Sequence, residues 1–165
     1  MMRQEEIQET LLRLCKHYGE QNWWQSDNKL EDLVSTILIQ RTSEKNIKLA
    51  LAGLMDIMAV EGILGLSLED LRKQLLELKG IGSETADALL LYFFDRSVFI
   101  SDEYAIRLFR RLGGNFDTYN EMQAVYCNVL EGLTLKQCQE IHAVIDEHGK
   151  GFSKSKGQLD ESWLR

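Results

Sequence analysis

Two glycines between amphipathic segments are the feature that most constrains the fold of this 165-residue chain. Gly80 and Gly82 flank one apolar residue and separate segments 68–78 and 84–94, whose apolar residues have helical spacing. Glycine permits a sharp turn and a close approach of the backbone to a ligand. The amides near Ser83 would lie at a helix N-terminus, where the helix dipole favours an anion. The alternative interpretation is a plain helix–helix turn with a glycine cap.

The rest of the chain also predicts helices. Apolar residues recur with helical spacing in segments 5–18, 30–40, 44–58, 103–112, 119–130 and 135–148. The chain contains no proline, so caps and glycines must set the helix ends. Residues 97–101 predict only a short extended stretch. We therefore predict an all-α protein with one domain over residues 1–165, a hairpin at about 68–95 and a loosely attached tail at 152–165.

The charge balance is unlike that of a dedicated polyanion binder. The 26 acidic and 19 basic residues give a net charge of −7, whereas nucleic-acid-binding proteins are usually basic on their working face. Local patches can still neutralise a few phosphates. Two candidate patches, which are otherwise ordinary solvated charges, are Arg107, Arg110 and Arg111, and Lys150, Lys154 and Lys156.

Other features predict a cytoplasmic protein without a metal. Cys15, Cys127 and Cys138 show no CxxC spacing and are expected to be free thiols in a reducing compartment. The three histidines show no metal-ligand spacing. No apolar run reaches the roughly 18 residues that a membrane span needs, and the polar N-terminus is unlike a signal peptide.

An acidic residue follows the hairpin at a specific distance. Asp102 comes twenty residues after Gly82, where a short apolar stretch meets the next helical segment. Aspartate is a favoured N-cap, so a purely structural role is one interpretation. The order of hairpin, apolar stretch and acid also allows a catalytic carboxylate.

Two segments carry a resemblance to a known family. The first runs from Gly-Ile-Gly-Ser-Glu-Thr-Ala through Val-Phe-Ile-Ser-Asp-Glu-Tyr to Arg-Leu-Phe-Arg-Arg-Leu-Gly, within about residues 75–114. The second comprises Asn22-Trp23-Trp24 and the stretch Ile37-Leu38-Ile39-Gln40-Arg41-Thr42. Together they resemble the endonuclease III-related branch of the helix-hairpin-helix (HhH-GPD) DNA glycosylase superfamily. The resemblance implies two small helical lobes with a cleft between them.

The resemblance also implies a function in base-excision repair. Such enzymes bind double-stranded DNA and flip a damaged base into a pocket. Asp102 would stabilise the oxocarbenium-like sugar and activate water. The hairpin would bind the DNA backbone, and it could hold a monovalent cation. The resemblance implies no partner protein and no membrane. The backbone-binding residues would be Lys79, Gly80, Ile81, Gly82, Ser83 and Thr85.

Pocket residues are carried over in the same way. One of the adjacent Trp23 and Trp24 would stack on an electron-poor methylated base, unless both are core or rim aromatics. Gln40 matches a glutamine that fills the gap left by the flipped base, unless it is simply a polar helix end.

The chain departs from the family pattern at several positions. Bifunctional members have a lysine where Glu84 stands, and a carboxylate cannot form the Schiff base of a lyase. Glu84 is also a favourable first-turn helix residue. No cysteine follows Ser153, so no [4Fe-4S] cluster is expected. Only about 35 residues separate Thr42 from Lys79, which indicates a shortened lobe, and Arg41 replaces the family's asparagine.

Three hypotheses follow from these features. The first is a monofunctional glycosylase that hydrolyses the N-glycosidic bond of a damaged base, such as a methylated purine, through Asp102. The second is a catalytically degenerate relative that only grips DNA through the hairpin. The third is a small helical protein whose hairpin serves packing or protein contacts.

Overall fold

The computed structural model of the chain describes residues 3–23 and 43–164. Within these ranges the regular structure is entirely helical, which confirms the all-α prediction: there are seven α-helices, two 3-10 helices and no strand. The chain forms two compact units, one of residues 24–96 and one of residues 1–23 with 97–165. We call them the hairpin unit and the α8 unit. None of the helices in the described ranges has the length and apolarity of a membrane span.

In the hairpin unit, serine caps set the starts of two helices. The backbone amide of Asn46 donates to the Ser43 hydroxyl, and that of Asp70 donates to the Ser67 hydroxyl. Such caps satisfy amides that have no partner inside the helix. The elements are α3 (Glu44–Met58), η1 (Ile63–Gly65), α4 (Leu68–Glu77) and α5 (Ser83–Tyr92). The helix expected over residues 30–40 lies outside the described residues.

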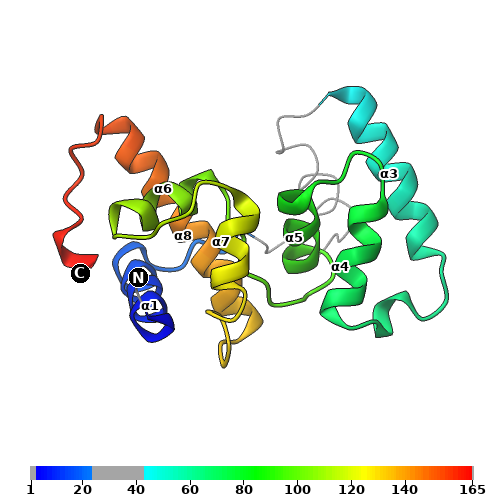
Figure 1. Cartoon of the computed structure of the whole chain (residues 1–165), viewed down its shortest axis with the longest axis horizontal. Coiled ribbons are helices and arrows are strands. Elements are labelled where there is room, and N and C mark those ends of the chain that lie inside the picture. Colours follow the sequence, from blue (N-terminus) through cyan, green and yellow to red (C-terminus); the bar gives the residue numbers. More distant parts are fainter. Residues whose placement is uncertain (1–2, 24–42, 165) are drawn as a thin grey trace. The chain divides into compact units, whose positions relative to one another are not determined.

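The α8 unit is organised around its longest helix. Both α1 and α6 pack on α8 (Figure 1). A capping box, in which Thr134 and Gln137 exchange hydrogen bonds, starts that helix. The elements are α1 (Gln4–Tyr18), α6 (Glu103–Arg111), α7 (Tyr119–Tyr126), α8 (Leu135–Lys154) and η2 (Ser162–Leu164).

An aromatic cluster forms part of the core of the α8 unit. The buried ring of Tyr126 lies 5.7, 5.1 and 5.4 Å, centroid to centroid, from the rings of Phe99, Phe109 and Phe116. Burial raises the pKa of Tyr126 to about 12. The cluster joins the chain before α6 to α6 itself and to α7, so it fixes the position from which α6 starts.

The C-terminal part of the chain differs from the sequence-based expectation. Helix α8 ends at Lys154 rather than His148, because Gly149 and Gly151 lie inside the helix instead of ending it. The segment after α8, expected to be a loose tail, packs on the unit: Leu164 is 1% exposed, and the Trp163 ring stacks on His17 at 4.2 Å.

Candidate functional site

The hairpin places its two glycines in different environments. Gly80 has φ +89°, and a Cβ there would lie 2.8 Å from the Asn46 carbonyl oxygen of α3. Gly82 is the N-cap of α5 in an extended conformation, and a Cβ there would meet nothing within 4 Å. Gly80 is therefore required by the fold itself. Gly82 leaves open space at the start of α5, where the first-turn amides and the helix dipole attract an anion.

The two helices of the hairpin are joined by an apolar plug and an ion pair. Ile81, between the glycines, is 7% exposed. The Arg72 guanidinium of α4 makes two hydrogen bonds, of 2.6 and 3.0 Å, to the fully buried carboxylate of Asp87 in α5. A bidentate pair of this kind holds both helices in one geometry. The hairpin is thus rigid before any ligand arrives.

The other residues carried over to the hairpin are unequally accessible. Lys79 is exposed, and Ser83 and Glu84 are half-buried in the first turn of α5. Thr85 is only 8% exposed, so its side chain belongs to the core. Lys79, Gly82 and Ser83 are the members of the predicted set that a phosphate can reach most easily.

Asp102 caps α6 with one oxygen and presents the other to a histidine. Its Oδ1 accepts a hydrogen bond of 2.8 Å from the amide of Ala105, which confirms the cap interpretation. Its Oδ2 lies 3.6 Å from Nε2 of His142 in α8. The residue is 8% exposed. Because the cap uses Oδ1 alone, Oδ2 remains available for chemistry.

An aromatic and a cation complete the surroundings of Asp102. The ring of Trp23 meets His142 edge to face at 6.2 Å, and Lys150 Nζ lies 5.1 Å from the Trp23 ring centroid. Lys150 is also ion-paired with Asp146 and with Glu147. The hydrogen bond with Asp146 raises the pKa of Lys150, against the effect of its burial. Its ammonium group is therefore held protonated.

Sequence reasoning placed Asp102 and Trp23 in one site but missed His142, which stands between them. The sequence around His142 contains no motif that marks it as functional. Only the packing of α8 against α6 brings His142 to the Asp102 carboxylate. Trp24, Gln40 and Arg41 lie outside the described residues. Asp102 belongs to the α8 unit, whereas the glycine turn belongs to the hairpin unit.

The described residues offer no obvious metal site. No group of three or more His, Cys, Asp or Glu side chains in residues 3–23 and 43–164 is arranged to hold an ion. All three cysteines are free thiols. Burial raises the pKa of Cys15 to about 11. A thiol with so high a pKa is a poor metal ligand and a poor nucleophile.

Comparisons with known proteins agree with this arrangement. No protein-family model matches the chain. A protein of Methanocaldococcus jannaschii that is named as a predicted DNA repair glycosylase is 29% identical over 195 aligned positions, which cover 89% of this chain and 88% of that protein. The crystal structure of the 3-methyladenine DNA glycosylase of H. pylori, bound to 1,N6-ethenoadenine, shares the fold with a TM-score of 0.57. It is 22% identical, over 96% of this chain and all of that one.

These matches extend over almost the whole chain, and they agree with a Gly-Ile-Gly hairpin and an aspartate at the start of the following helix. The chain is therefore similar to a DNA repair glycosylase over almost its whole length, and it shares the helical fold of a 3-methyladenine DNA glycosylase.

Proposed function

We propose that the protein is a monofunctional DNA glycosylase that hydrolyses the N-glycosidic bond of a damaged purine in double-stranded DNA. The observation that carries the proposal is the geometry of Asp102, whose Oδ1 is engaged as a helix cap while Oδ2 is not. The capping bond fixes the carboxylate in place. A fixed carboxylate in a poorly hydrated site stabilises a developing cationic sugar well.

The chemistry follows from this carboxylate. As the bond between base and sugar breaks, positive charge develops on the sugar, and Asp102 stabilises it. The same carboxylate can accept a proton from the water that attacks the sugar carbon. His142 lies against the reactive oxygen, so we assign it the role of orienting the Asp102 side chain.

A lyase step through a lysine is not part of the proposal. Glu84 stands at the position of the family's lysine. Lys150 lies near Trp23, but its ion pairs with Asp146 and Glu147 keep it protonated, and an ammonium group is not a nucleophile. Treatment with borohydride during the reaction is therefore expected to trap no covalent complex with DNA.

The base is proposed to stack on Trp23. This ring is 44% exposed and lies on the Asp102 side of the α8 unit through its contact with His142. Methylated purines are the first candidates, and the H. pylori neighbour was crystallised with an etheno-purine. Because Lys150 already places a positive charge over the ring, a test must include neutral as well as cationic bases.

The hairpin is proposed to bind the DNA backbone through the start of α5. The open space at Gly82 lets a phosphate approach the backbone amides of α5, and Lys79 adds a positive charge beside it. A monovalent cation at the hairpin stays a prediction. The cytoplasm is the proposed location, because the three cysteines are free thiols.

The test is base release from duplex DNA that carries 3-methyladenine, 7-methylguanine or 1,N6-ethenoadenine. Asp102→Asn is the decisive variant, because asparagine is as good an N-cap as aspartate and should keep α6 intact. We expect the variant to bind DNA normally and to lose at least about 100-fold in single-turnover excision. Glu103→Gln, which neutralises the exposed neighbouring carboxylate, serves as the matched control and should retain activity.

The alternative outcomes distinguish the competing functions. Salt-sensitive DNA binding without release of any base would indicate a degenerate DNA-binding relative, which the net charge of −7 and the shortened sequence also allow. Release that is equally fast in the Asp102→Asn variant would overturn the mechanism. A protein that binds no DNA would overturn the function as a whole.

A further inference from the structure

A concave site lies in the α8 unit, where the end of α8 faces α6. It is a cavity of about 350 Å³ lined on one side by Arg107 and Arg111 of α6 and on the other by Ser153 and Lys156. These residues come from both basic patches of the sequence. The fold thus brings Lys156 beside two arginines that lie at least 45 positions earlier in the sequence. The stretch around Lys156 carries no acidic residue from Gly149 to Gln158.

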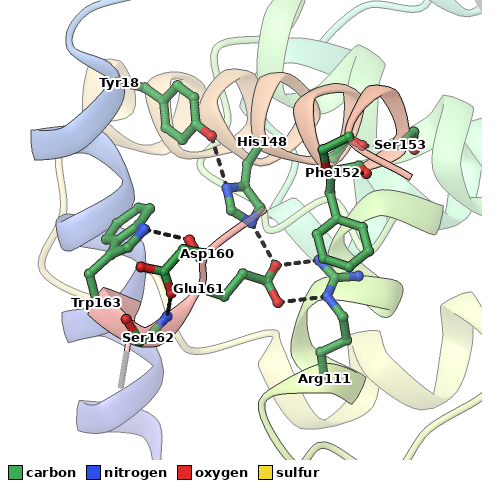
Figure 2. Close-up of polar contacts among 11 residues, drawn as sticks. Tyr18, Arg111, His148, Phe152, Ser153, Asp160, Glu161, Ser162 and Trp163 are labelled. Carbon is green, nitrogen blue, oxygen red and sulfur yellow. Dashed lines mark hydrogen bonds and ion pairs between the residues drawn. The ribbon is translucent and has the colours of Figure 1, made fainter. Parts of the chain in front are cut away.

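The walls of this cavity are held by contacts that do not depend on a ligand. Glu161 makes hydrogen bonds of 2.8 and 2.6 Å to Arg111, whose guanidinium carbon lies 3.7 Å from the ring centroid of Phe152. Figure 2 shows Glu161 also bound to the buried His148, at 2.7 Å, and His148 bound to the Tyr18 hydroxyl at 3.0 Å. Arg111 is therefore a fixed part of the wall.

Two other cations remain available to a ligand. Arg107 is half-exposed, and its pair with Glu103 is an exposed i,i+4 pair, which is weak and easily exchanged. Lys156 is exposed. Ser153 also lines the cavity, and its hydroxyl donates a hydrogen bond of 2.9 Å to the Gly149 carbonyl. Cations of this kind around a small hollow fit a phosphate group.

The backbone at Lys156 is unusual. This residue has φ +53°, a conformation that residues with a side chain rarely adopt and that glycine usually fills after a helix. Gly157 follows with φ +81°. A lysine in place of glycine is a local cost in stability, and such a cost points to a role for the side chain.

The cavity shares one face of α8 with His142, the residue that lies against Asp102. His142, Asp146, Gly149 and Ser153 are spaced along one face of α8, and Gly149 is packed against Tyr104 of α6. Arg107 lies roughly 8 Å from Asp102 along the axis of α6, at about 1.5 Å per residue. One DNA strand carries a phosphate every ~3.4 Å of helix axis. The cavity is thus within about two or three nucleotides of a sugar bound at Asp102.

We propose that this cavity binds a backbone phosphate of the substrate DNA near the target nucleotide, with Arg107 and Lys156 as the cations that bind it. The proposal rests on the proposed function. It assigns to the C-terminal segment a part in DNA binding that is independent of the hairpin.

The test measures DNA affinity as a function of salt for the double variant Arg107→Gln/Lys156→Gln. We expect affinity to fall about tenfold or more, and the slope of log K against log salt to decrease by about one to two. The matched control is Arg13→Gln/Lys154→Gln. Arg13 has the same i,i+4 pairing, and Lys154 neighbours Lys156 without lining the cavity.

A second variant separates binding from stability. Lys156→Gly relieves the backbone conformation, so its Tm should be unchanged or higher while its DNA affinity falls. A purely structural role for Lys156 predicts instead that affinity follows stability.

The outcomes are distinct. Unchanged affinity and salt slope in the folded double variant would overturn the phosphate site but leave the proposed function intact. A rise in Tm with inorganic phosphate that the double variant loses, without any change in DNA affinity, would show a site for free phosphate and overturn the DNA assignment. A wild-type protein that binds no DNA would overturn both proposals.

Discussion

The contacts within the hairpin and those within the α8 unit join residues at very different separations in the sequence. The ion pair that joins α4 to α5 connects residues only fifteen positions apart, Arg72 and Asp87. In the α8 unit, Gln8 donates to the carbonyl of Val129, 121 residues away, and Tyr18 contacts His148 across 130 residues. The hairpin is thus a local motif, whereas the surroundings of Asp102 exist only after both ends of the chain have met.

This difference explains which site was visible in the sequence. A local motif leaves a local signature, because turn residues, caps and apolar spacing all lie in one stretch. A site built from distant segments leaves only single residues with ordinary alternative roles. Asp102 looked like a helix cap, which it is, and His142 had no signature at all.

The largest expected effect comes from breaking the ion pair between Arg72 and Asp87. Arg72→Ala leaves the fully buried carboxylate of Asp87 without its bidentate partner and should lower the free energy of unfolding by about 3 kcal/mol. Urea unfolding followed by circular dichroism measures the change. Lys73→Ala, an exposed position in the same helix, should stay within about 0.5 kcal/mol. Equal effects of the two variants would show that the ion pair between Arg72 and Asp87 does not contribute to stability.

The next effect tests the close contact on which the α8 unit depends. A Cβ at Gly149 would lie under 3.0 Å from three atoms of the Tyr104 side chain, so Gly149→Ala should cost about 1–3 kcal/mol by forcing α6 away from α8. A Cβ at Gly151 meets ordinary contacts, the nearest at 3.8 Å.

Gly151→Ala, in the same helix, is therefore the control. It should be neutral or stabilise the protein by up to about 1 kcal/mol, because alanine is the better helix former. The same unfolding measurement applies. A Gly149→Ala variant as stable as its Gly151 counterpart would mean that the glycine is not needed for packing.

The two hairpin glycines provide a smaller effect that separates folding from binding. Gly80→Ala should cost about 1–2 kcal/mol, because its positive φ disfavours a side chain and the Asn46 carbonyl leaves no room for one. Gly82→Ala should leave stability within about 0.5 kcal/mol and weaken DNA binding by about tenfold through loss of close backbone approach. Fluorescence anisotropy with a duplex reports the affinity. Full affinity in the Gly82 variant would argue that the hairpin does not contact DNA.

The smallest expected effect is the pH dependence of the C-terminal segment. Burial lowers the pKa of His148 below its ordinary value. Burial acts to raise the pKa of Glu161, but its hydrogen bonds with Arg111 and His148 outweigh this and lower it. In the folded state both groups therefore bind fewer protons than in the unfolded chain. Their stabilising contribution is present above the ordinary values and is lost as pH falls.

We accordingly expect faster amide exchange in residues 155–164 as pH falls below about 6.5, where unfolded histidine gains its proton, with a further increase below about 4.5 from Glu161. Exchange rates must be corrected for the intrinsic effect of pH. The His148→Gln variant should lose the upper step and keep the lower one. A wild-type segment equally protected at pH 7 and pH 5 would contradict the expectation.

Much of the local structure was predictable because its causes are local. Three helices start at ordinary capping residues, namely Ser43, Ser67 and Asp102. The hairpin turn occurs at the Gly-Ile-Gly tripeptide. The predicted end of α8 was wrong because it, too, was inferred from local signals. Gly149 and Gly151 look like stop signals, and only the close packing of Tyr104 on Gly149 shows why a glycine is needed inside a helix.

The sequence by itself determined the helical class, the hairpin, the capping role of Asp102 and the absence of a lysine after Gly82. These follow from residue chemistry and from spacing within a few turns. Only the tertiary structure decided that His142 faces Asp102, that the C-terminal segment is anchored by Glu161, and that two basic patches share one cavity. Such features depend on which faces of distant helices pack together, and packing is a collective property of the core that no short stretch of sequence encodes.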